Sequence, residues 1–377
     1  MAELGFIIPL NLNDYLAFIG KPQGDRTNWC STQQWWTNEN IQLSGSSLGP
    51  TSAKVGDTVS VQVGIQGVLG SHGTEEGQIL HVQAWVCYPN TVPGGAGPLV
   101  PSMLTGPTPA KDLTGSPVSI FGSAQVGDYQ SPGPAYKQFT LDNTWSPQQQ
   151  DIIPPNTDAH CCILATCQGL ADINNEGGVE VGLFVLGTDL SPIDICTEPH
   201  EGQTNVTILP ISGGMRRGGL LLSDFGFLSG AAVRGERAQV VVEVTPLAQP
   251  NGIDPAVLRV LKAGPWSGLP LRPATSDPRG LGLRKNRHGF EGWLAKIVCE
   301  AEEFIEDLVE IVEGRPDDDH RGRRIRLTLP PNGLQPLLMQ TELDASEPPG
   351  TVHVFDIVQT ETSGRRGGIR VGVVVVP

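Results

Sequence analysis

The chain has 377 residues and a formal net charge of −15 at pH 7, with 25 Lys and Arg against 40 Asp and Glu. At about 100–200 residues per domain, this length predicts two or three domains. A net charge of this sign argues against non-specific nucleic-acid binding, which needs a cationic face. Residues 1–210 hold 19 acidic and 5 basic side chains (net −14), and residues 211–377 hold 21 and 20 (net −1), which together give −15.

Composition favours many short strands. The chain contains 47 Gly and 32 Pro, and its apolar residues, 38% of the total, occur in short runs between turn residues. The N-terminal stretch lacks the charged start and long apolar core of a secretory signal, and no run reaches 18 apolar residues. We therefore expect no membrane span. We also expect synthesis without a recognisable signal peptide, with the protein either cytoplasmic or exported by a leaderless route.

Alternation of period two predicts the strands of the N-terminal half. Residues 57–67 alternate apolar and polar side chains, as a half-buried strand does, and residues 78–88 have one wholly apolar face. Turn residues separate the further predicted strands, near residues 117–122, 135–141, 160–168, 179–186 and 204–210. Together they predict a β-sandwich over residues 40–210, preceded by an N-terminal arm, residues 1–39.

The C-terminal half, residues 211–377, repeats this plan. Six stretches read as strands: 238–247, 257–263, 324–330, 335–343, 351–361 and 368–377. The last ends in consecutive valines, Val373 to Val376, which predicts a strand buried on both faces. Over 289–313 apolar residues instead recur at three- and four-residue steps opposite an acidic face, which predicts a long amphipathic helix. This helix would be inserted in a second β-sandwich and would cover either that domain's own core or a neighbouring molecule.

The stretch AHCCILATC (residues 159–167) raises the question of a metal site. On a strand Cys162 points one way, while Cys161 and Cys167 point the other, so adjacent cysteines cannot share one ion. The five-residue step from Cys162 to Cys167 also differs from the usual zinc spacing. Free Cys packs as a small hydrophobe, so we predict a buried core strand. The alternatives are a metal site that recruits Cys196 and His200, and a disulfide to Cys196.

Other reactive side chains form no recognisable motif. Residues 317–320 (Asp-Asp-Asp-His) could bind a hard cation, but a solvated acidic loop is the simpler interpretation. Asp172, Asn174 and Glu176 make a weaker calcium candidate, because they lack the twelve-residue loop pattern, and a plain hairpin turn is the better interpretation. We find no nucleophile elbow, phosphate loop, dinucleotide fingerprint or His-Glu-x-x-His motif. We expect no catalytic residue, no metal and no cofactor, and a hydrolase is only a third choice.

The N-terminal half resembles a known family. KVGDTVSVQVGIQG, followed by HVQAWVCYP, resembles the opening of bacterial immunoglobulin-like modules of the CARDB type (cell-adhesion-related domain found in bacteria). The match is carried by Gly56, Asp57, Val59, Val61 and Val63, while Gln66-Gly67-Val68 replaces the family's Asn-x-Gly turn. A second segment, WSPQQQDIIPPNTDAHCCILATC, is similar to a segment of related sandwiches. The residues that carry this match are Trp145, Pro147, His160 and Cys162.

This resemblance covers about residues 40–210. It implies an immunoglobulin-like binding or spacer module without catalytic residues. Residues 211–377 show only a generic sandwich pattern. We therefore expect an all-β chain of two tandem immunoglobulin-like β-sandwiches, with the long helix inserted in the second.

Paired arginines precede paired glycines in MRRGGL (215–220) and GRRGGIRV (364–371). Together with Arg321, Arg323, Arg324 and Arg326 they make the C-terminal half patchily cationic. Exposed hairpin turns are one interpretation. The other is docking onto the acidic N-terminal half of a neighbour, since complementary charge steers association. The candidates for such an interface are Arg216, Arg217, Arg365 and Arg366.

The N-terminal arm carries apolar side chains that need cover, either from the second domain or from a neighbouring subunit. These further interface candidates are Phe6, Ile7, Ile8, Tyr15 and Phe18. We therefore predict a non-enzymatic structural or interaction protein that forms a homo-oligomer or homopolymer, such as a filament, tube or surface layer. The alternative is a carbohydrate- or protein-binding module that uses exposed Trp35, Trp36 or Trp266.

Overall fold

The structure is a computed structural model of the full chain. It describes residues 5–10, 35–68, 79–87, 111–112, 118–119, 136–149, 152–153, 155–156, 158, 162–170, 201–212, 216–217, 219–230, 237–285, 323–329, 334–362 and 366–377. These residues form four β-sheets and one short helix, which confirms a mainly β fold. No helix in this part of the chain is long and apolar enough to cross a membrane.

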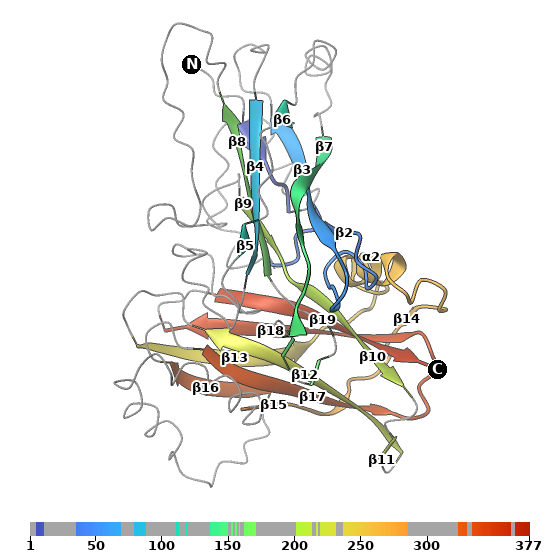
Figure 1. Ribbon diagram of the computed structural model, residues 1–377. Helices are drawn as coiled ribbons and strands as arrows, with labels where there is room; N and C mark the ends of the chain where they lie inside the picture. Colours follow the sequence, from blue (N-terminus) through green and yellow to red (C-terminus); the bar gives the residue numbers. More distant parts are fainter. Residues whose placement is uncertain are drawn as a thin grey trace, which may run out of the picture.

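The N-terminal half contributes two of the sheets (Figure 1). In sheet 1, β3 (Val59–Val68) pairs with β1 (Gly5–Ile7), β2 (Ile41–Ser44) and β7 (Tyr136–Trp145), all antiparallel. Sheet 2 has the order β5-β4-β8-β9, and β6 also pairs with β4. Its strands are β4 (Ile79–Cys87), β5 (Lys111–Asp112), β6 (Val118–Ser119), β8 (Cys162–Leu170) and β9 (Glu201–Thr204).

One apolar core lies between sheets 1 and 2. Val59, Val61 and Val63 are 0% exposed, which confirms the predicted alternation in β3. Val82 and Ala84 meet them from β4, and Ile163 and Ala165 from β8.

The C-terminal half forms the other two sheets. Sheet 3 has the order β10-β19-β18-β13-β16, with β14 on β18, and sheet 4 has the order β11-β12-β17-β15. The strands of sheet 3 are β10 (Val206–Ser212), β13 (Ala238–Pro246), β14 (Arg272–Pro273), β16 (Arg324–Leu329), β18 (Thr351–Glu361) and β19 (Arg366–Val376). Those of sheet 4 are β11 (Arg216–Arg217), β12 (Leu220–Gly230), β15 (Arg279–Lys285) and β17 (Leu334–Asp344).

Sheets 3 and 4 enclose a second core. Phe225 and Phe227 of β12 stack at 5.9 Å between ring centroids, against Ile369 and Val371 of β19. The valines at the end of β19 confirm the predicted burial on both faces. Val373 and Val375 belong to this core, and Val374 lies under the helix on the opposite face.

The helix α2 (Pro255–Ala263) corrects one prediction, because residues 257–263 were expected to form a strand. Asp254 caps the helix by accepting hydrogen bonds from the backbone N–H groups of Ala256 and Val257. Pro255 occupies the first turn, where its missing N–H costs nothing. Val257, Val260 and Leu261 fall on one helical face and are buried against sheet 3.

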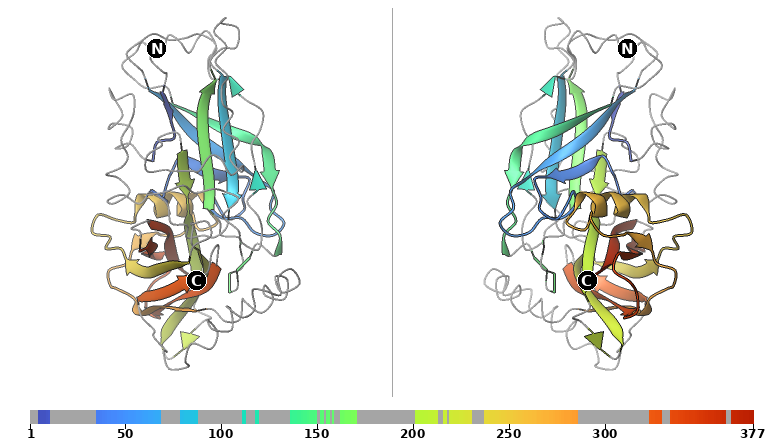
Figure 2. Two further views of the ribbon diagram at one scale, coloured as in Figure 1. Left: turned by 90° about the vertical axis from the view of Figure 1, so that its left-hand side faces the viewer. Right: turned by 90° about the vertical axis from the view of Figure 1, so that its right-hand side faces the viewer.

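The strands of sheets 1 and 2 run crosswise to those of sheets 3 and 4, and β9 and β10 connect the two halves (Figures 1 and 2). Asn205 alone separates β9 in sheet 2 from β10 in sheet 3. The expected domain boundary at residues 210/211 therefore falls inside β10. The predicted helix at 289–313 and strand at 179–186 lie outside the described residues.

Candidate functional site

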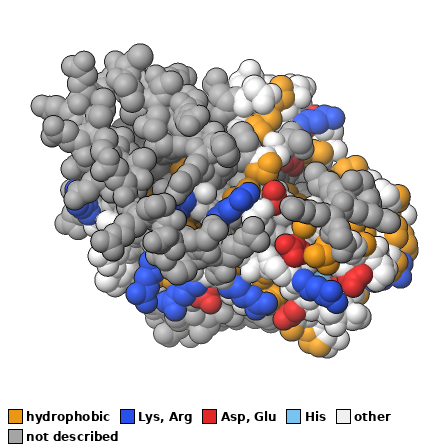
Figure 3. Space-filling view, turned by 90° about the horizontal axis from the view of Figure 1, so that it is seen from below, with side chains coloured by type: hydrophobic (Ala, Val, Ile, Leu, Met, Phe, Trp, Pro, Cys, Tyr) orange, Lys and Arg blue, Asp and Glu red, His pale blue; other side chains and the backbone are white. Residues whose placement is uncertain are grey.

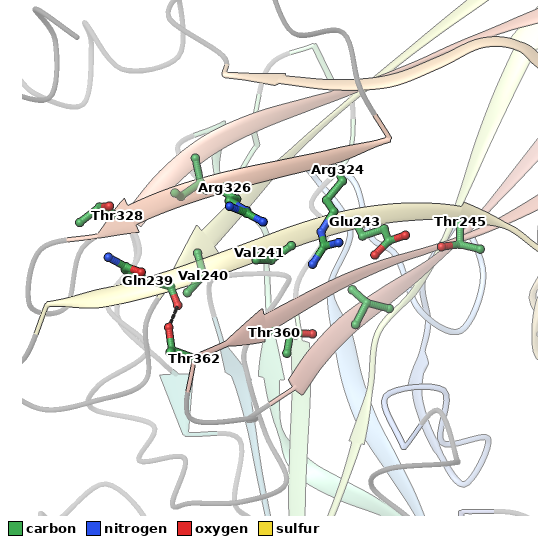
Figure 4. A pocket seen from close by; sticks show the side chains of 12 residues that line it. Gln239, Val240, Val241, Glu243, Thr245, Arg324, Arg326, Thr328, Thr360 and Thr362 are labelled. Carbon is green, nitrogen blue, oxygen red and sulfur yellow. Dashed lines mark hydrogen bonds between the residues drawn. The ribbon is translucent and has the colours of Figure 1, made fainter. Parts of the chain in front are cut away.

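The outer face of sheet 3, turned away from its core, carries a polar hollow of about 720 Å³ over β13, β16 and β18 (Figure 4). Strand register sets its floor. One cross-strand row joins Arg326, Val241 and Thr360. The next row joins Arg324, Glu243 and Val358. Because side chains alternate along a strand, both rows share one face of the sheet.

Threonine and amide side chains surround the two arginines. Thr328 lies opposite Gln239 in the register, and Thr245 follows Glu243 by two residues on the same face of β13. The Thr362 hydroxyl donates to the Gln239 carbonyl over 3.1 Å and closes one end of the hollow. The lining therefore combines hydrogen-bonding and charged groups with apolar surface from residues such as Val241 and Val358.

Two cations in this hollow are free to bind an anion. Arg324 and Arg326 are both exposed, and neither has an ion-pair partner within the described part of the chain. Glu243 lies opposite Arg324 in the register, and no salt bridge joins the two side chains among the described residues. Guanidinium groups hold carboxylates and similar oxyanions with paired hydrogen bonds. On the underside of the molecule, Lys and Arg side chains are interspersed with Asp and Glu (Figure 3).

A buried ion network lies two residues further along the same face. Arg370 of β19 contacts both carboxylate oxygens of Asp356, each at 2.8 Å, and Asp254 at 3.0 Å. The Arg370 and Asp356 side chains are 4% and 6% exposed. Burial disfavours the charged arginine, but its two carboxylate partners outweigh burial and raise the pKa of Arg370. The network ties β19, β18 and the first turn of α2 together.

The N-terminal half docks against this face beside the hollow. Trp36 is 1% exposed and packs on Gly368, where an added Cβ would lie 2.7 Å from the Trp36 ring. The Asn205 N–H donates to the Trp36 carbonyl over 2.8 Å, and the Asn205 side chain donates to the Gly368 carbonyl over 3.0 Å. Gly372 allows the same close approach by Val257 of α2. Glycines on β19 thus expose bare backbone where other elements must pack closely.

Two more contacts fix the halves to each other. The loop after β2 reaches α2, because an added Cβ at Gly264 would lie 2.8 Å from the Leu48 carbonyl oxygen. The Asn156 side chain donates to the Gly226 carbonyl of β12 over 2.7 Å and accepts from the Gly226 N–H over 3.2 Å. Asn156 therefore joins the N-terminal half to sheet 4, while Trp36 joins it to sheet 3.

The cysteine-rich stretch forms a strand, as predicted. β8 begins at Cys162, and its residues Ile163, Leu164 and Ala165 are each 0% exposed. The side chains of Cys162 and Cys167 and all of Cys161 lie outside what the structure describes, as do Cys196 and residues 317–320. Among the described residues no three His, Cys, Asp or Glu side chains gather as ligands of one metal ion.

The predicted interface residues are spread over several elements. Phe6 and Ile7 lie on β1, paired with β3, and Ile8 is 0% exposed in the core of the N-terminal half, so its own domain covers it. Tyr15, Phe18 and Arg365 lie outside the described residues. Arg216 and Arg217 form β11 of sheet 4, whereas Arg366 pairs with Thr360 in sheet 3 and so continues a row of the hollow.

The alternative of a binding module that stacks sugars on exposed Trp35 and Trp36 does not hold for these two residues. They are 2% and 1% exposed and meet edge to face, with ring centroids 5.4 Å apart. The aromatic side chain of Trp266 is partly buried against the core under α2. These rings are therefore packing elements. Their burial had no signal in the sequence, because it depends on contacts between distant segments.

Comparisons with known proteins add little. No protein-family model matches the chain, and no curated protein matches it. The CupB6 tip adhesin from Pseudomonas aeruginosa aligns over 89% of this chain and 93% of its own, with 9% identity and a TM-score of 0.23. A mutant of the CFA/I adhesin CfaE from enterotoxigenic E. coli aligns over 92% and 88%, with 8% identity and a TM-score of 0.20. Scores this low carry no argument.

Proposed function

We propose that this chain is a non-enzymatic structural or interaction protein that associates with copies of itself as the repeated subunit of a larger assembly. Its two halves would be tandem immunoglobulin-like sandwiches joined into one rigid unit. The observation that carries the proposal is the combination of a cationic hollow, with Arg324 and Arg326 unpaired in the described structure, and an N-terminal half of net charge −14.

The rigid junction supports this proposal. An assembly subunit must hold its binding surfaces at a fixed angle, and the Trp36 contact with Gly368 and the Asn156 hydrogen bonds with Gly226 join the two halves. Cationic and acidic surfaces on opposite halves of one chain can pair between molecules and fix their register.

Light scattering across a salt series tests the proposal. Opposite charges are screened over about 3 Å at 1 M salt and over about 30 Å at 0.01 M. We therefore expect a mass well above the 40.1 kDa monomer at low salt, and a fall toward the monomer at high salt. A protein that stays monomeric at high concentration and low salt would contradict the proposal. Electron microscopy of the low-salt sample would then show whether the assembly is a ring, tube or filament.

A further inference from the structure

We propose that the hollow over β13, β16 and β18 is the docking site for the acidic N-terminal half of a second copy of this chain. The inference rests on the proposed self-association and names the surface that mediates it. The cross-strand register of sheet 3 places Arg324 and Arg326 two residues apart on one face of β16.

The backbone presents these two cations in a fixed arrangement. Residues two apart on a strand are separated by roughly 6.6 Å, and the β13 ladder holds β16 in register. The two arginines thus leave the strand with the spacing of alternate residues in an extended segment, so one extended acidic segment can offer a carboxylate to each. Thr328, Thr360 and Gln239 add hydrogen-bonding groups around them. With two arginines against one carboxylate, Glu243, the lining has a net positive charge that suits an acidic partner.

Charge identifies the second copy as the occupant. Residues 1–210 carry net −14, and within them residues 151–200 contain eight acidic side chains and no Lys or Arg. The molecule's own N-terminal half is anchored over β19, where Trp36 covers Gly368. The hollow extends away from that anchor, toward β13 and the outer strand β16. The same acidic half on another molecule can therefore approach it.

The contact would join two different surfaces, the C-terminal half of one copy and the N-terminal half of the next. Such a heterologous contact leaves one binding surface free at each end of a pair. Further copies can add there, which gives a ring or an open filament. This predicts a polar assembly with a distinct cationic end and acidic end.

Charge reversal in the full-length protein tests the site. Arg324→Glu with Arg326→Glu changes the net charge by 2 × (−2) = −4, and the matched control Arg284→Glu with Lys285→Glu changes it by the same amount. The control residues are exposed on β15 of sheet 4. At low salt, we expect the concentration at which half of the hollow variant is associated to rise about tenfold or more, because like charges repel at the contact. The control should behave as wild type.

Mixing gives a second, independent readout. The hollow variant keeps its own acidic half, so it can bind to the cationic end of a wild-type assembly but cannot accept another copy. One variant per ten wild-type molecules should therefore shorten the assemblies, as measured by light scattering, whereas the control variant should leave their length unchanged. A self-complementary contact would give no such asymmetric capping.

The outcomes separate the two proposals. A wild-type chain that stays monomeric at low salt overturns both, and would fit occupation of the hollow by the chain's own acidic half. Assembly of the hollow variant at wild-type concentrations overturns only the docking site, as does equal weakening by the control. Far-UV circular dichroism checks the fold. If the glutamates disturb it, Arg324→Gln with Arg326→Gln removes the charges and should still weaken association.

Discussion

At the scale of single residues, Arg370 is the most demanding group described in the C-terminal half. Bringing a charged guanidinium into the interior costs several kcal/mol, which only close carboxylates can offset. Asp356 provides two contacts of 2.8 Å and Asp254 a third of 3.0 Å. The same face of β19 has Gly368 and Gly372 on either side, so the long arginine side chain stands between two positions that other elements approach closely.

Breaking this network on one side should be costly. We expect Arg370→Met to lower the free energy of unfolding by about 3–5 kcal/mol, because the Asp356 carboxylate stays buried without its guanidinium partner. Replacing both groups, Arg370→Met with Asp356→Leu, should recover most of the loss. Urea unfolding of the two single variants and the double variant gives the coupling energy. Additive losses would show that the two side chains do not depend on each other.

At the scale of elements, α2 shows how one aspartate performs two tasks. One carboxylate oxygen of Asp254 caps the helix, and the other binds Arg370 of β19. The helix therefore begins where it is also fixed to sheet 3, and its apolar face follows directly onto Val352, Val354 and Val374.

Two substitutions separate these tasks. Asp254→Ser keeps a capping oxygen but loses the ion pair, whereas Asp254→Ala loses both. We expect the alanine variant to be less stable than the serine variant by about 1 kcal/mol, the usual value of an N-cap. The difference should appear as faster amide hydrogen exchange at Ala256 and Val257. Equal exchange in both variants would mean that the cap contributes nothing and that only the ion pair matters.

Sequence patterns predicted the strands well where apolar alternation was regular, as in β3, β18 and β19. They failed at α2, because VLRVLKA contains β-branched residues that also suit a strand. The preceding Asp254-Pro255 and the following Gly264 were the missed helix signals. β12 was missed because Ser223 and Ser229 occupy inward positions between its apolar residues. Ser229 is 0% exposed and donates to Gln359 over 2.5 Å, a partner that only the fold supplies.

The candidate site was only partly predictable. The sequence showed a concentration of arginines that included Arg324 and Arg326, but not that they line a hollow with Thr360, a residue 34 positions further on from Arg326. Register between distant strands creates that neighbourhood. From the shared Arg-Arg-Gly-Gly motif, Arg216 and Arg217 looked equivalent to Arg365 and Arg366. β11 nevertheless places them on sheet 4, whereas Arg366 belongs to β19 of sheet 3.

At the scale of the whole molecule, close packing at Gly368 should decide whether the two halves unfold together. An added methyl would come within 2.7 Å of the Trp36 ring, and overpacking typically costs about 1–3 kcal/mol. We expect Gly368→Ala to split calorimetric unfolding into two transitions and to shift tryptophan fluorescence to the red.

Gly268→Ala is the matched control, because a Cβ there meets no atom within 4 Å. It should leave both readouts unchanged. If Gly368→Ala also unfolds in a single transition at the wild-type midpoint, the contact with Trp36 does not couple the halves, and the remaining contacts at Asn205 and Asn156 suffice.

The passage from β9 to β10 has a mechanical consequence. The chain crosses between the halves as one extended strand, and β10 lies parallel to β19 from Val206 opposite Arg370 to Ser212 opposite Val376. A force that pulls the halves apart along this strand would act parallel to β10 and β19. The hydrogen bonds between the two strands would then have to break together rather than one after another. The β9–β10 connection therefore resists bending between the halves and transmits a pulling force directly from one half to the other.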